Sequence, residues 1–177
     1  ITRSVRLRNL GKEDVYLTKA LSMCLDMDNR DFSLLTLHGS WARERRIQYR
    51  KIGHGRQGVF SERGETSHQE HCFLGLTAPG ISQTAGEVYG FHFVYSGNFH
   101  GQCGVDQFDS VRTVFGINPY NFSWKLTEND AFQTPEVVMV YSAQGLGHMT
   151  RTFHDLYRNH LIRSPWKHQR RPILINN

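Results

Sequence analysis

The chain has 177 residues, a length typical of one globular domain. Its 21 Lys and Arg against 16 Asp and Glu give a formal net charge of +5. No apolar run approaches the roughly 20 residues that a membrane-spanning helix needs, and the first residues (ITRSVRLRNL) resemble neither a signal peptide nor a transit peptide. The three cysteines, Cys24, Cys72 and Cys103, are too few for a disulfide scaffold and predict a reducing compartment, the cytoplasm.

Both ends of the chain suggest a piece of a longer protein. The sequence has no initiating Met, and residues 5–8 (VRLR) already alternate like a strand with one buried face. At the other end, residues 172–175 (PILI) form an unbroken apolar run, typical of a strand buried on both faces in a parallel sheet. We therefore expect an excised segment; the alternative is a natural short chain whose last strand joins its own sheet.

Most of the chain between these ends is predicted to form strands. The strongest pattern is residues 87–95 (EVYGFHFVY), where the Tyr and Phe rings share one face and Val, Gly and His the other. Pro135 interrupts residues 132–141 and predicts an edge position or a bulge there. The other predicted strands are residues 15–23, 32–38, 46–52, 111–115 and 122–126. This order indicates an antiparallel β-sandwich and not a βαβ array.

One helix is predicted near the end of the chain. Apolar side chains recur from Met149 to Leu161 at steps of three or four, which gives one apolar stripe. Gly145 and Gly147 precede this stripe and Pro165 follows it, so both helix boundaries are plausible. A basic linker, residues 163–171, then leads to the apolar run at the end.

A cluster of basic residues is the first candidate for chemistry. Residues 43–51 carry four Arg and one Lys with Tyr49 among them, and Trp41 lies just before. Such a pattern could bind nucleic acid through phosphate contacts and stacking rings. However, Glu44 interrupts it and no RNA-binding or zinc-finger motif accompanies it. A strand that faces solvent or an interface is the better interpretation.

The segment SHQEHC (residues 67–72) and several aspartates are two further candidates. His68, His71 and Cys72 are too few for zinc, and no third group orients a Cys–His dyad. Glycosidase chemistry needs two carboxylates, about 5–5.5 Å apart in retaining enzymes. The aspartates at 26, 28 and 31, and those at 106 and 109, fit turn capping better, so nothing selects a catalytic pair.

Ten ordered motifs resemble the bacterial α-galactosidases of glycoside hydrolase family 36. They cover essentially the whole chain: ITRS (1–4), ALSM (20–23), GSWARER (39–45), SHQ (67–69), GEVYGF (86–91), VYSGNF (94–99), VDQF (105–108), GINP (116–119), FQTPEVV (132–138) and RPILINN (171–177). In that family a β-supersandwich precedes a (β/α)8 barrel. The resemblance thus implies a β-supersandwich segment at residues 1–144, a connecting helix and linker at 145–171, and the first barrel strand at 172–177.

The same resemblance implies which functional groups this chain holds. The family is retaining, and its aspartate nucleophile and acid/base lie on the barrel, beyond Asn177. The one family contact to sugar that maps here is Trp41 of GSWARER, so we expect Trp41 to bind substrate, where otherwise it would be a core or interface anchor. The resemblance implies no metal or organic cofactor, because two carboxylates suffice. It also implies homotetramers in which these domains approach neighbouring subunits.

Two positions depart from the family pattern. Cys72 stands where proline usually follows SHQ, and Cys103-Gly104 replaces a β-branched and an acidic residue. A Cys72–Cys103 bridge cannot be predicted from sequence.

The sequence thus predicts a catalytically inert part of an α-galactosidase that releases terminal α-linked galactose from melibiose or raffinose. One alternative is a stand-alone carbohydrate-binding sandwich that uses Trp41 and an exposed Tyr/Phe face at residues 87–95. Another is a nucleic-acid-binding module.

Overall fold

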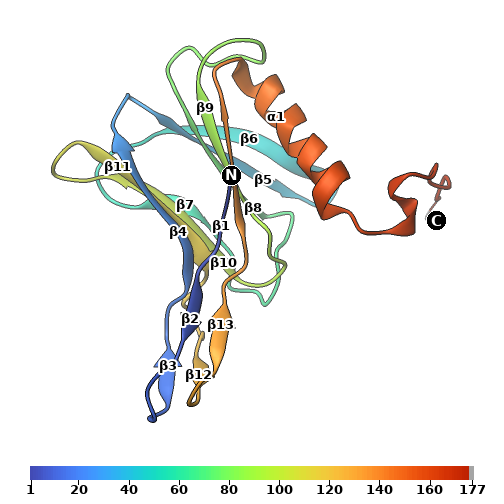
Figure 1. Ribbon diagram of the computed structural model, residues 1–177. Helices are drawn as coiled ribbons and strands as arrows, with labels where there is room; N and C mark the ends of the chain where they lie inside the picture. The colour runs from blue at the N-terminus through green and yellow to red at the C-terminus, as the bar shows by residue number, and fades with distance from the viewer. Residues whose placement is uncertain (176–177) are drawn as a thin grey trace.

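Two antiparallel sheets packed face to face form the body of the molecule in a computed structural model that describes residues 1–175 (Figure 1). The six-stranded sheet has the order β1 (Thr2–Arg3), β14 (Val137–Ser142), β9 (Val88–Phe93), β8 (Glu70–Thr77), β5 (Ser33–Ser40) and β6 (Arg43–Lys51). The four-stranded sheet has the order β4 (Leu21–Asp28), β11 (Ser110–Ile117), β10 (Phe99–Val105) and β7 (Gln57–Phe60). The predicted mainly β, antiparallel sandwich is confirmed.

Two short ribbons extend from the sandwich at its lower end in Figure 1. In one, β3 (Val15–Leu17) pairs with β12 (Trp124–Leu126), and in the other β2 (Arg6–Arg8) pairs with β13 (Ala131–Gln133). After the last strand come helix α1 (Gly145–Leu156), a π-helical turn (Tyr157–Leu161) and a 3-10 turn (Pro165–Lys167). No helix within residues 1–175 has both the length and the apolar character that a bilayer crossing requires.

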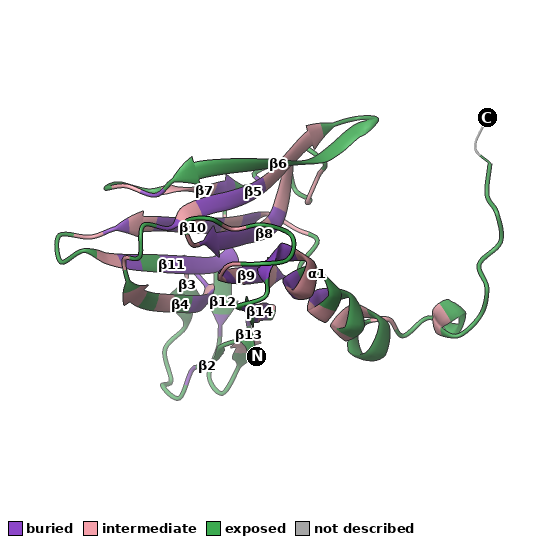
Figure 2. Cartoon of the chain, turned by 90° about the horizontal axis from the view of Figure 1, so that it is seen from above, coloured by how far each residue is buried: buried purple, intermediate pink, exposed green. Residues whose placement is uncertain are grey.

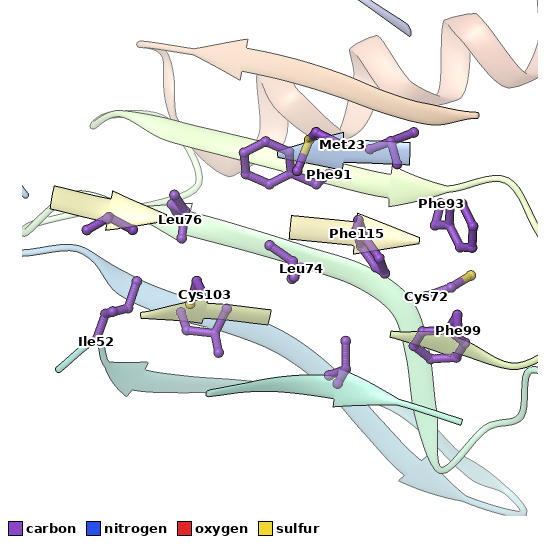
Figure 3. Packing of buried hydrophobic residues seen from close by; sticks show 14 of the residues in the cluster. Met23, Ile52, Cys72, Leu74, Leu76, Phe91, Phe93, Phe99, Cys103 and Phe115 are labelled. Carbon is purple, nitrogen blue, oxygen red and sulfur yellow. The ribbon is translucent and has the colours of Figure 1, made fainter. Parts of the chain in front are cut away.

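The main core lies between the two sheets and is built largely from phenylalanine (Figure 3). Phe91 and Phe93 come from β9, while Phe99 and Phe115 come from β10 and β11 of the facing sheet, and all four are almost fully buried. The rings of Phe93 and Phe115 stack with centroids 5.5 Å apart. Burial of each such ring contributes roughly 2–3 kcal/mol, so this seam is what holds the sheets together.

Helix α1 covers the opposite face of β9. Met149 and Phe153 on the helix pack into a second cluster with Val88 of β9, and all three are buried. Gly90 of β9 makes this approach possible, because a Cβ there would lie 2.6 Å from Sδ of Met149 and 2.8 Å from the Phe153 ring. Strand β9 is therefore buried on both faces although its sequence alternates.

A partly buried polar contact joins the turn after the helix to the sheet. The Tyr157 hydroxyl lies 2.5 Å from Nδ1 of His92 on β9, and Nε2 of the same ring lies 3.7 Å from Sγ of Cys72 on β8. Burial lowers the pKa of His92 to about 4, with nearby His71 adding to the effect, and raises the pKa of Cys72 to about 11. The imidazole is therefore neutral at pH 7 and the thiol is protonated.

Several predicted strands need correction. The run 15–23 is two strands, β3 and β4, which belong to different sheets. The run 132–141 is also two strands, β13 and β14, and Pro135 lies in the break between them and not at an edge or bulge. Strands β7, β8 and β10 were not predicted. In β10 the inward positions do alternate, but Gly101 and Gly104 dilute the pattern that identifies a strand.

The predicted helix is confirmed, but it begins earlier than its apolar stripe. Gly145 is its first residue, with a φ of 76°, and a Cβ there would lie 2.6 Å from the backbone nitrogen of Ala85. Glycine thus allows the sharp turn from β14 into the helix. The stripe runs past Leu156 into the π-helical turn.

The apolar run at the end of the chain does not form a strand in the described residues. Residues 172–175 have no regular secondary structure, and Ile173, Leu174 and Ile175 are exposed; residues 176 and 177 lie outside the described part. A strand needs a hydrogen-bonding neighbour, and Figure 2 shows this segment extending away from the sandwich. The assignment of residues 172–177 to a first barrel strand stays a prediction.

Replacing Gly90 tests the packing of the helix on β9. We expect Gly90→Val to lower the free energy of unfolding by about 1–3 kcal/mol, because the added methyl groups overlap Met149 and Phe153. Gly53→Val is the matched control, since a Cβ at Gly53 meets nothing within 4 Å. Urea unfolding of both variants measures the difference, and equal losses would contradict the packing argument.

The buried imidazole predicts a loss of stability in acid. In the unfolded chain His92 takes up a proton near pH 6.5, whereas in the folded chain it does so only near pH 4, so stability falls as pH drops between these values. The slope from this residue is at most about 1.4 kcal/mol per pH unit. We expect His92→Gln to lose less stability than the wild type between pH about 7 and about 4.5, as measured by urea unfolding. The exposed His168, changed to Gln, is the control and should leave the slope of the wild type unaltered.

Candidate functional site

Trp41 stands at the tip of the hairpin that joins β5 to β6. Only Trp41 and Ala42 separate the end of β5 at Ser40 from the start of β6 at Arg43, and Trp41 is 85% exposed. Trp41 is therefore not part of the core that residues 1–175 form. An indole left in water is a ready contact for a ligand or for another protein surface.

The hairpin that carries Trp41 is bent by a bulge. The register of β5 and β6 shifts between His38 and Ser40, so Gly39 faces the backbone of Glu44 and Arg45. A Cβ at Gly39 would lie 2.5 Å from the carbonyl oxygen of Arg43, and only glycine fits there. Ala42 and Arg45 have φ values of 58° and 57°, the left-handed region that L side chains rarely adopt.

The neighbouring strand β8 and the residue just before it hold the base of this hairpin. The amide of Gly39 donates to the carbonyl oxygen of Gln69 at 3.4 Å, and Nε of Arg45 donates to Nε2 of His71 at 3.4 Å. The pKa of His71 is lowered, first by burial and then by the charge of Arg45, which favours the neutral ring that can accept a hydrogen bond. The two motifs GSWARER and SHQ, distant in sequence, thus form one unit.

An open polar cleft of about 730 Å³ adjoins this unit. Its walls carry charges of both signs and hydrogen-bonding groups: Glu44, Arg45, Arg63, Glu65, Thr66, Ser67, His68, His71 and Cys72. Sequence reasoning singled out several of these residues but not their meeting, since only the pairing of β5 with β8 brings them together. Arg63, Glu65 and Thr66 carried no sequence signal.

The residues of the SHQEHC segment form neither the metal site nor the nucleophilic dyad that were considered for them. His68, His71 and Cys72 all line the cleft, but Cys72 is itself buried and its sulfur lies 3.7 Å from Nε2 of His92. Across residues 1–175, no three His, Cys, Asp or Glu side chains converge as a metal site would require. Cys72 and Cys103 both lie in the main core, where they are free thiols (Figure 3). Burial raises the pKa of Cys103 to about 12, so neither is a nucleophile.

Most of the aspartates that were weighed as a catalytic pair have structural contacts. Asp106 caps its turn by accepting from the amides of Phe108 and Ser110, as predicted. Asp26 does not lie in a turn, as we expected, but in β4, where its carboxylate binds the Arg112 guanidinium through two hydrogen bonds of 2.7 Å. This contact lowers the pKa of Asp26.

The other three aspartates lie in or beside the turns that follow β4 and β10. Asp28 also belongs to β4 and not to a turn, whereas Asp31 lies in the turn beyond it and pairs with Lys51. Asp109 accepts from the Asn29 side chain at 2.7 Å. These contacts tie neighbouring loops together and leave no pair marked out for glycosidase chemistry.

The basic run forms an exposed edge of the six-stranded sheet. All nine residues of β6 are exposed, which agrees with the solvent-facing or interface-facing strand that we preferred (Figure 2). Two of its cations already have partners, since Lys51 binds Asp31 at 2.7 Å and Arg45 binds His71.

The proposed exposed aromatic face of residues 87–95 is wrong. Phe91 and Phe93 are buried between the sheets, and only Tyr95 at the end of the run is exposed. Alternation correctly groups these side chains on one face, but that face is the inner one. A carbohydrate-binding module could therefore use Trp41 but not this strand.

Comparison with known proteins agrees with the fold. The family model of the glycosyl hydrolase family 36 N-terminal domain matches residues 1–127, and the melibiase model matches residues 131–177. The chain is 50% identical to the α-galactosidase AgaA of Geobacillus stearothermophilus and 47% identical to the α-galactosidase Mel36A of Lactobacillus acidophilus, in both cases over its whole length.

A solved structure gives the same result in three dimensions. A doubly substituted variant of Geobacillus AgaA in complex with raffinose superposes on 99% of this chain with a TM-score of 0.96 at 50% sequence identity. The chain spans 24% of that structure and 24% of each of the two relatives. On the family match and on this likeness of fold, the chain belongs to glycosyl hydrolase family 36.

Proposed function

We propose that this chain is the later part of the β-supersandwich domain of a retaining α-galactosidase that releases terminal α-linked galactose from oligosaccharides such as melibiose and raffinose. The observation that carries this proposal is the match to α-galactosidases over the whole chain, at 50% identity to one of them. In the proposed division, residues 1–144 are sandwich, 145–171 connect, and 172–177 begin the (β/α)8 barrel.

In this proposal the chain does not itself break the glycosidic bond. Active sites of such barrels lie at the carboxyl ends of the barrel strands, and the two carboxylates of the retaining reaction would come from there. The contacts of Asp26 and Asp106 described above support this division of labour. No metal or organic cofactor is needed for a displacement by two carboxylates.

The contribution of this chain to the site would be Trp41. An indole offers an apolar face to the C–H groups of a sugar ring and an N–H donor to a hydroxyl. The 85% exposure of Trp41 and its fixed place at the hairpin tip support this role. The barrel of the same chain and neighbouring subunits of a homotetramer are the proposed partners, and the exposed β6 is a surface that they could cover. Three free thiols fit the cytoplasm as its location.

The 177-residue chain by itself should be inert. We expect no release of nitrophenol from a nitrophenyl α-galactoside and no heat signal when the chain is titrated with galactose or melibiose. Sugar binding without hydrolysis would instead favour a stand-alone carbohydrate-binding module. Salt-dependent binding to DNA, tested at two salt concentrations, would favour the nucleic-acid module. Hydrolysis by the chain alone would contradict the proposal.

Removal of the indole should weaken substrate binding in the complete enzyme. We expect Trp41→Ala to raise KM for melibiose by about fivefold or more, the effect of losing a contact worth over about 1 kcal/mol. Phe108→Ala is the control, since this side chain is 79% exposed on another loop. Steady-state kinetics measures both, and an unchanged KM for Trp41→Ala would remove Trp41 from the site.

A further inference from the structure

The orientation of Trp41 has to come from the backbone beneath it. With 85% of its surface exposed, the indole receives little support from packing. A side chain free to sample several orientations loses that freedom when it binds a ligand, and affinity falls accordingly. The contacts that hold the peptide units at 41 and 42 therefore affect how tightly Trp41 can bind a ligand.

Those peptide units are in a conformation that is not favoured by their own residues. Ala42 has a φ of 58°, and Arg45, three residues later, has a φ of 57°. Non-glycine residues persist in this region only where surrounding contacts impose it. Gly39 allows the two strands to approach here, but it does not hold Ala42 in place.

One side chain binds the turn directly. Oε1 of Glu44 accepts a hydrogen bond from the amide of Ala42 at 3.0 Å, and this amide belongs to the peptide bond that follows Trp41. Glu44 is itself kept in place from the next residue, because Arg45 donates to His71 on β8.

From this geometry we infer that Glu44 is a positioning residue, whose carboxylate holds the Trp41–Ala42 peptide and so pre-orients the indole for a sugar. The benefit for sugar binding rests on the proposed function of Trp41, whereas the effect on the indole does not. Glu44 acts through the acceptor oxygen and not through its charge, so glutamine can replace it and alanine cannot.

The first test reads the indole in the 177-residue chain. In a two-dimensional NMR spectrum of the indole N–H groups, Trp41→Phe assigns the Trp41 signal. We expect Glu44→Ala to shift this signal and to lower its heteronuclear NOE, and Glu44→Gln to restore both. Glu128→Ala is the matched control, because it removes an exposed glutamate from the turn between β12 and β13. A Trp41 signal that is unchanged in Glu44→Ala would overturn the inference.

The second test is a double-mutant cycle in the complete enzyme. We expect Glu44→Ala to raise KM for melibiose roughly three- to tenfold, the cost of ordering a free side chain on binding, with kcat unchanged. Glu44→Gln should keep the KM of the wild type. In the Trp41→Ala background, Glu44→Ala should have no further effect.

The outcomes of the two tests distinguish the positioning role of Glu44 from the sugar contact of Trp41. An equal rise in KM with and without Trp41 would overturn the positioning role of Glu44. If Trp41→Ala leaves KM unchanged, the proposed sugar contact fails, while the NMR test still decides whether Glu44 orients the indole.

Discussion

Strand β9 has to bury both of its faces, and the rest of the molecule is arranged around that requirement. Its Phe91 and Phe93 pack against the four-stranded sheet, while Gly90 and Val88 receive helix α1. A central strand cannot slip by one residue without exchanging the two faces, and here that exchange would place a phenylalanine against the helix and leave a hole in the sandwich. The register of β9 therefore fixes both the spacing of the sheets and the seat of the helix.

This fixed register reaches the candidate site through two strand pairings. Strand β9 pairs with β8, and β8 pairs with β5, which leads into the hairpin of Trp41. The contacts of Gly39 with Gln69, just before β8, and of Arg45 with His71 of β8 then set the base of the hairpin. The exposed Trp41 is thus connected to the phenylalanine core through hydrogen-bonded strands. These strands support it more rigidly than a free loop would.

The alternation of apolar and polar residues predicted most of the strands, but it did not show what covers each face of a strand. It grouped Phe91 with Phe93 correctly, yet it left open whether that face meets water or a second sheet, and the choice of an exposed face was wrong. Strand β10 was missed because Gly101 contributes no side chain to the pattern, although the glycine is needed where a Cβ would lie 2.6 Å from the Phe115 ring. Where a glycine is needed at such a close contact is determined by the pairing of strands that are distant in sequence, and the local sequence does not show that pairing.

The same limit applied to the site. The family motif pointed to Trp41, but neither composition nor spacing showed that its hairpin and the segment from Arg63 to Cys72 form one cleft. That meeting depends on the pairing of His38 with Glu70, which joins segments over thirty residues apart. The role inferred for Glu44 was also invisible, because a glutamate beside three arginines looks like part of a charged surface until its bond to Ala42 is seen.

The charges on β6 make sense once its place at an open sheet edge is considered. Strand β6 pairs with β5 on one side only, and the backbone groups on its open side would invite another strand to add. Arg43, Arg46 and Arg50 oppose this, because a new strand would have to desolvate these cations or match them with acids. A charged edge therefore keeps the hairpin from pairing with unrelated strands, yet it still permits a specific acidic or polar surface to dock. The basic run is better explained by this protection than by contact with nucleic acid, since it also accounts for why the basic charges follow the long edge strand of the six-stranded sheet.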